Sequence, residues 1–166
     1  MAVLPLLRFP DPRLRLAAAP VFAFDAALRS LADDLRDTMR AAPGIGITAC
    51  HVGIAQRLVV LELGPETGVR VYANPRIVWA SGETATHREG SVAMPGVTEE
   101  VERPARVRIA YQDLTGAAHE EEAEGLLAVC HQHEIDQLDG IFWIERLSRL
   151  KRDRAIKKFE KLLRRA

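Results

Sequence analysis

The chain has 166 residues, 48% of them hydrophobic, which is enough apolar content to bury the core of one domain spanning residues 1–166. Lys+Arg and Asp+Glu number 23 each, so the overall charge favours neither a nucleic acid nor a strongly acidic partner. Two cysteines do not make a disulfide framework. Prolines interrupt residues 1–15 before a secretory core can form, and no apolar run is long enough to span a membrane. We therefore expect a cytoplasmic protein without membrane contact.

The first half of the chain predicts one helix followed by strands. Asp25 is expected to cap a helix that ends at Pro43-Gly44. The apolar side chains that recur on one face of this helix are Leu28, Leu31, Ala32, Leu35 and Met39. Alternating or β-branched runs then predict strands at 58–63, 69–72, 76–80 and 101–113, with Asn74-Pro75 separating the second from the third.

Two further helices are expected in the second half. The first, about 124–138, carries Leu127, Cys130, His133 and Gln137 on one stripe. The second is capped by Ser148, and its core stripe is Ile156, Phe159 and Leu163. His119 and His131 have no partner residue at the spacing of a metal or catalytic site, and we expect them at the surface or in loops. Strands followed by a central helix that packs on them predict an α+β domain.

The most informative motif is His-Glu-Ile-Asp-Gln at 133–137, one residue short of the zinc-hydrolase motif His-Glu-x-x-His. In that motif two imidazoles one helical turn apart bind a metal, and the glutamate handles protons. Here His133 and Glu134 are present, but the second imidazole is replaced by the amide of Gln137. A neutral amide is a poor ligand for zinc or ferrous iron.

Three motifs occur in order: Gly44 to His51 (GIGITACH), Glu89 to Ala93 (EGSVA), and His133 to Gln137 (HEIDQ). Together they resemble the motifs of peptide deformylases, G-x-G-L-A-A-x-Q, E-G-C-L-S and H-E-x-D-H. The resemblance covers about residues 4–150 and implies the deformylase fold, in which mixed or antiparallel strands pack around the central motif helix and a C-terminal helix follows.

The resemblance also implies a function and a site. Deformylases remove the N-formyl group from the initiating methionine of new polypeptides. A thiolate at position 91 and imidazoles at 133 and 137 would hold the metal, Glu134 would move the proton, and a glutamine at 51 with the N–H of Val92 would stabilise the oxyanion. The substrate pocket would be lined by Gly44, Ile45, Gly46, Glu89, Gly90 and Cys130.

The chain departs from this pattern at Ser91, Gln137 and His51, and at Thr98, where many members place an arginine that supports the glutamate of the second motif. His133 is the only family ligand left. We therefore expect no tightly bound metal, weak or absent deformylation, and a retained pocket for a formyl-Met peptide. Any metal that does bind would be divalent iron, zinc or nickel.

Three alternatives remain open from the sequence. A metal could be rebuilt around His51 and His133, which would leave an active metal-dependent hydrolase, or His51 could be only a polar wall of the pocket. Ser91 and His133 could act as nucleophile and base. Residues 145–166 hold ten Lys/Arg against three acids, and by resemblance this C-terminal helix could contact the ribosome.

Overall fold

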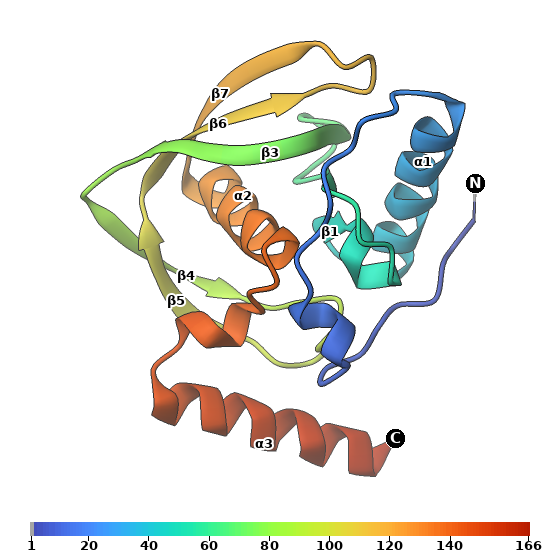
Figure 1. The fold of residues 1–166 in the computed structure, drawn as a ribbon. Coiled ribbons are helices and arrows are strands. Elements are labelled where there is room, and N and C mark those ends of the chain that lie inside the picture. Colours follow the sequence, from blue (N-terminus) through green and yellow to red (C-terminus); the bar gives the residue numbers. More distant parts are fainter. Residues whose placement is uncertain (1) are drawn as a thin grey trace.

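The computed structural model describes residues 2–166, which form three α-helices and seven strands joined by short 3-10 turns (Figure 1). The helices are α1 (Ala26–Ala41), α2 (Gly125–Leu138) and α3 (Arg149–Arg165). The strands are β1 (Gly46–Thr48), β2 (Leu58–Leu61), β3 (Arg70–Ala80), β4 (Thr84–Glu89), β5 (Glu99–Pro104), β6 (Arg106–Gln112) and β7 (Ala118–Glu124). Within this part of the chain, none of the helices has the length and apolar character needed to cross a bilayer.

All strand pairs in the two sheets are antiparallel. The larger sheet has the order β1-β2-β3-β6-β7, and β4 pairs only with β5. Helix α2 packs against strands of both sheets and lies between them in Figure 1. Ten of its residues are buried, so α2 is the central element of an α+β fold, as expected.

The three predicted helices are confirmed, and so are the two predicted caps. The Asp25 carboxylate accepts a hydrogen bond from the Leu28 N–H, and the Ser148 hydroxyl accepts one from the Lys151 N–H. One detail of α3 is wrong: Phe159 is buried, but Leu163 is 50% exposed. Ala155 is buried instead and, with Phe159, joins a cluster that includes Met94. Through this cluster α3 supports the loop between β4 and β5.

The strand boundaries needed correction. Asn74-Pro75 does not end a strand: β3 runs unbroken from Arg70 to Ala80, with a bulge between Ala73 and Arg76 where Asn74 takes a φ of 51°. The predicted strand at 101–113 is two strands, β5 and β6, which belong to different sheets. Strands β1, β4 and β7 were not predicted.

Gly140 is needed where α2 ends, and a substitution there should be costly. Its φ is 78°, and a Cβ at this position would overlap the carbonyl oxygen of Arg15. We expect Gly140→Ala to lower the free energy of unfolding by about 2–3 kcal/mol, measured by urea denaturation. Gly64→Ala is the matched control, because its Cβ would meet no atom within 4 Å. Equal stability of the two variants would contradict this account.

Candidate functional site

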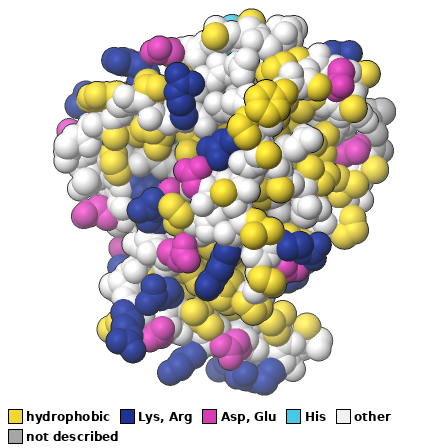
Figure 2. All heavy atoms as spheres, viewed as in Figure 1, with side chains coloured by type: hydrophobic (Ala, Val, Ile, Leu, Met, Phe, Trp, Pro, Cys, Tyr) yellow, Lys and Arg dark blue, Asp and Glu magenta, His cyan; other side chains and the backbone are white. Residues whose placement is uncertain are grey.

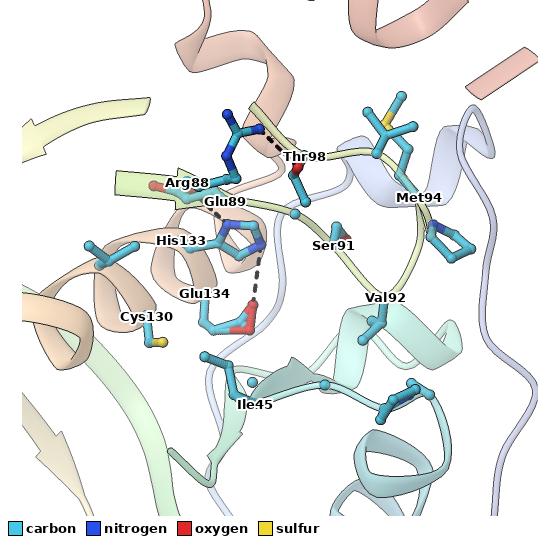
Figure 3. A pocket seen from close by; sticks show the side chains of 18 of the residues that line it. Ile45, Arg88, Glu89, Ser91, Val92, Met94, Thr98, Cys130, His133 and Glu134 are labelled. Atoms are coloured by element: carbon cyan, nitrogen blue, oxygen red, sulfur yellow. Dashed lines mark hydrogen bonds and ion pairs between the residues drawn. The ribbon is translucent and has the colours of Figure 1, made fainter. Parts of the chain in front are cut away.

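A cavity of about 450 Å³ lies between the start of β1, the loop after β4, and α2 (Figure 3). The three sequence motifs meet there. The structure brings together nearly all the predicted site residues along this cavity, namely Gly44, Ile45, Gly46, His51, Glu89, Gly90, Ser91, Val92, Cys130, His133 and Glu134. Gln137 does not line it.

His133 is held in a fixed orientation by a carboxylate on the neighbouring hairpin. Its Nδ1 lies 2.9 Å from Glu89 Oε1, and its Nε2 lies 3.7 Å from Glu134 Oε1 (Figure 3). Burial disfavours the imidazolium, but the two carboxylates outweigh it and raise the pKa of His133. The bond to Glu89 leaves Nε2 as the ring atom available to the cavity.

Glu89 is in turn held by a buried arginine that the sequence motifs did not reveal. Arg103 Nε lies 2.6 Å from Glu89 Oε2, and its Nη2 lies 2.9 Å from Oε1. The same guanidinium contacts Asp136 of α2 at 2.8 Å. Burial of Glu89 is outweighed by His133 and Arg103, which lower its pKa to about 2. The expected loss of this support at Thr98 was therefore wrong, because the supporting cation comes from position 103.

Glu134 lies deep in the cavity with one oxygen unpartnered. Its side chain is 3% exposed, and burial raises its pKa to about 7. Oε2 has no hydrogen-bond partner among the described residues. A Cβ on Gly46 would lie 3.1 Å from this oxygen, so the glycine gives the carboxylate the space it occupies.

His51 is a buried neutral imidazole whose tautomer is set by the backbone. The Thr48 N–H donates to His51 Nδ1 at 3.0 Å. A backbone N–H can only donate, so Nδ1 carries the lone pair and Nε2 carries the proton. Burial and the proximity of His133 lower the pKa of His51 to about 3, which keeps the ring neutral. Nε2 is buried without a partner in the described part of the chain, and in this tautomer it carries a proton to donate and has no lone pair for a base or a ligand.

The two altered ligand positions are occupied by other hydrogen bonds. Ser91 Oγ accepts from the Ala93 N–H at 3.1 Å, and no hydrogen bond joins it to His133 among the described residues. The nucleophile–base pair that the sequence left open as an alternative is therefore not assembled. Gln137 is 2% exposed, and its Nε2 donates to the Leu14 carbonyl at 2.7 Å. Its amide ties α2 to the N-terminal segment instead of facing the cavity.

Two other expectations have different outcomes. Cys130 lines the cavity as expected, where burial raises its pKa to about 12, so the thiol stays protonated and unreactive. His131 is not at the surface: it is 1% exposed, and its Nε2 lies 2.6 Å from Glu121 Oε2 of β7. This pair was not predicted, because β7 itself was not predicted.

Val92 lies on the cavity wall, where its carbonyl accepts a hydrogen bond from Arg8 Nη1 at 2.9 Å. The role of its N–H toward an oxyanion stays a prediction.

Comparisons with known proteins identify the family. The family model for polypeptide deformylase matches residues 3–153. A protein of Rhizobium meliloti (strain 1021) described as "Peptide deformylase-like" is 67% identical over 161 residues, covering 97% of this chain and 94% of that protein. The chain belongs to the polypeptide deformylase family. Its solved relatives include a peptide deformylase from Legionella pneumophila, with 39% identity and a TM-score of 0.93 over 98% of this chain and 96% of that one.

A second deformylase structure, from Ehrlichia chaffeensis in complex with actinonin, is 38% identical with a TM-score of 0.91, covering 97% of this chain and 98% of that one. Two further relatives come from Bradyrhizobium diazoefficiens. One is described as "Peptide deformylase-like" and is 65% identical over 99% of this chain and 96% of that protein. The other is described as "Peptide deformylase" and is 44% identical over 100% of this chain and 99% of that protein.

The side chains at the deformylase ligand positions do not fit the metal that this family uses. A neutral hydroxyl and an amide turned toward Leu14 replace a thiolate and an imidazole, and these are weak donors for iron, nickel or zinc. Within residues 2–166, no group of three or more His, Cys, Asp or Glu side chains is arranged to hold a metal ion.

Proposed function

We propose that this chain is a deformylase-like protein that binds the N-terminal end of a formyl-Met peptide but has little or no deformylase activity. The observation that carries this proposal is the hydrogen bond from Gln137 to Leu14, since it directs the side chain at a ligand position out of the cavity. With Ser91 offering only a neutral hydroxyl, His133 remains as the one good donor of the family set, and one imidazole holds a transition metal weakly.

The retained pocket supports the binding half of the proposal. The glycine loop before β1, the Glu89-Gly90 end of β4 and the motif helix all line one cavity, and apolar side chains such as Ile45, Val129 and Cys130 contribute to its wall. A cavity of this size accommodates a methionine side chain with its formyl group. The structure of the Ehrlichia relative is a complex with actinonin, so a deformylase of this fold binds a ligand.

The two Bradyrhizobium relatives add an independent argument. Proteins of both descriptions occur in that organism, and this chain is more similar to the deformylase-like one, at 65% against 44% identity. A deformylase-like protein that exists beside a deformylase need not supply the same activity.

The alternative is an active hydrolase with a metal rebuilt around His51 and His133. The geometry of His51 disfavours it, because Nε2 would have to lose its proton while Nδ1 still accepts the Thr48 N–H. Coordination through Nε2 would require the ring to turn and leave that N–H without its acceptor. A buried donor without an acceptor costs about 1–3 kcal/mol.

The central experiment measures metal content, binding and turnover on one preparation. After anaerobic purification we expect well under one iron, nickel or zinc ion per chain, measured by elemental analysis, because one imidazole is a weak site. Calorimetry should detect binding of formyl-Met-Ala-Ser, and an amine-release assay should detect little product. Near-stoichiometric metal that disappears in His51→Ala, together with steady turnover, would support the rebuilt-metal alternative and overturn the proposal.

Metal removal should leave the fold unchanged. The core clusters around α1 and α2 are apolar, and Gln137 fixes α2 to the N-terminal segment without an ion. We therefore expect EDTA to shift the melting temperature by less than about 1 °C, measured by calorimetry. A deformylase with its full ligand set, treated in parallel, controls for the chelator. A large drop in this chain alone would mean that a metal stabilises the fold.

Two wider expectations remain predictions. Lys and Arg side chains gather along the lower part of the molecule in Figure 2, where α3 lies, and this basic surface is where a ribosome contact would occur. A cytoplasmic location would be consistent with such a contact and is likewise a prediction.

A further inference from the structure

The mouth of the cavity carries one exposed charge. Among the residues that line the cavity, Glu89, Glu134 and His51 are buried and His133 is 12% exposed at its side chain, whereas Arg88 is exposed. Arg88 belongs to β4 and immediately precedes Glu89, so its side chain lies on the opposite face of the strand from the Glu89–His133 pair. The charge is therefore at the rim and not in the interior.

The Arg88 guanidinium is positioned by a hydrogen bond to the loop between β4 and β5, which forms part of the cavity wall. Its Nη1 donates to Thr98 Oγ1 at 3.1 Å (Figure 3). Thr98 is neutral, and no carboxylate lies within ion-pair distance of Arg88 in the described residues. Glu100 is directly opposite Arg88 in the β4–β5 ladder, but no ion pair joins the two. Four of the five N–H groups of the guanidinium remain available to a ligand.

Apolar side chains accompany this charge at the mouth. Ile45 is 42% exposed and Leu126 is 46% exposed, although both line the cavity. A ligand that covers Ile45 and Leu126 buries apolar surface, and the part of the ligand that extends beyond them lies next to the Arg88 guanidinium. The matching ligand has an apolar first residue and a carboxylate farther along its chain.

We propose that Arg88 is a specificity-determining residue that selects formyl-peptides with an acidic side chain in the residues after the methionine. This inference rests on the proposed binding of formyl-Met peptides, and it specifies which class of these peptides the protein binds best. Arg88 contributes by pairing with the carboxylate at the rim, where water screens the interaction. The preference is therefore modest and sensitive to salt.

The test compares three tripeptides blocked as C-terminal amides: formyl-Met-Ala-Asp, formyl-Met-Ala-Asn and formyl-Met-Ala-Lys. Dissociation constants are measured by calorimetry at low salt. We expect the intact protein to bind the Asp peptide about two- to five-fold more tightly than its neutral Asn isostere, and the Lys peptide more weakly than either. The difference should shrink at an ionic strength of about 0.3 M.

Two variants and a control assign the effect to Arg88. Arg88→Ala should bind all three peptides with nearly equal affinity, close to that of the intact protein for the Asn peptide. Glu100→Ala removes the competing carboxylate across the ladder and should increase the preference for the Asp peptide. Arg76→Ala, an exposed arginine of β3 outside the cavity, should leave the preference unchanged.

The outcomes separate the two proposals. Equal binding of the Asp and Asn peptides to the intact protein, or a preference that persists in Arg88→Ala, would overturn this inference and leave the proposed function standing. Failure of all three peptides to bind would overturn both.

Discussion

The triple variant Ser91→Cys, Gln137→His, His51→Gln should take up a transition metal and deformylate a formyl-Met peptide. The fold matches that of a solved deformylase, with a TM-score of 0.93, and Glu134 already lies in the cavity, so under the proposed function these three substitutions should supply the ligand chemistry. A four-ligand zinc site binds with roughly 10–16 kcal/mol, or about 3 kcal/mol per ligand. Restoring two ligands should therefore increase metal affinity on the order of 10⁴-fold.

Single changes should achieve much less, because each leaves the set incomplete. Gln137→His alone also removes the donor to the Leu14 carbonyl, which should destabilise the fold by about 1–3 kcal/mol before any metal compensates. Metal content and amine release are measured on the parent, the three single variants and the triple variant. A folded triple variant that binds no metal would show that the cavity has lost deformylase geometry. Metal uptake without turnover would locate the defect in the groups around the ligands.

Arg103→Ala should produce the largest loss of stability. Arg103 is 5% exposed at its side chain and pairs with Glu89 of β4 and Asp136 of α2, so it joins the small sheet to the central helix. Removing it leaves two buried carboxylates without this cation, which costs about 3–5 kcal/mol. For a chain of this size the melting temperature should fall by about 10 °C, measured by calorimetry.

A surface arginine provides the matched control for this loss. Arg108 pairs with Glu122 at 2.8 Å, with side chains 41% and 72% exposed, and Arg108→Ala should cost less than about 1 kcal/mol. Arg103→Lys should fall between the two, because an ammonium keeps the charge but cannot make the paired bonds to both Glu89 oxygens. Similar stability of the two alanine variants would contradict the role assigned to Arg103.

The sequence predicted those parts of the fold that depend on local patterns. The helix with its Asp25 cap, the motif helix and the Ser148 cap follow from hydrophobic spacing and capping residues, and each is confirmed. The family and the cavity followed from three short motifs, because the residues that such motifs contain meet at one place in the fold.

What the sequence could not predict depends on partners far along the chain. Asn74-Pro75 looked like a strand break, but the Asn74 amide donates to the Val21 carbonyl and to Gln112 Oε1, and these contacts hold the bulge inside β3. No strand was predicted for the acidic segment that forms β7, but it pairs with basic β6 through contacts such as Arg108 to Glu122.

The same limit applied inside the site. Arg103 is 14 residues from Glu89, and no motif joins the two. The tautomer of His51 depends on one backbone N–H, that of Thr48, whose direction is set by the turn after β1. Residue types alone left His51 open as a ligand, a base or a wall, and only the structure shows that its Nδ1 accepts a hydrogen bond and its Nε2 carries the proton.

The Glu89 carboxylate has two roles, one in the site and one in the fold, and a sequence comparison cannot distinguish them. It orients His133, and it also completes the buried ion pair that fastens β4 to α2 through Arg103. A lineage can exchange residue 91 or 137 without breaking those ion pairs, since among the described residues their side chains hydrogen-bond to the backbone of Ala93 and Leu14. Exchange of Glu89 would damage the architecture itself. A family member can therefore keep Glu89 because the fold needs it, whether or not the member is active. Surveys that seek catalytically competent members should give more weight to positions 91 and 137.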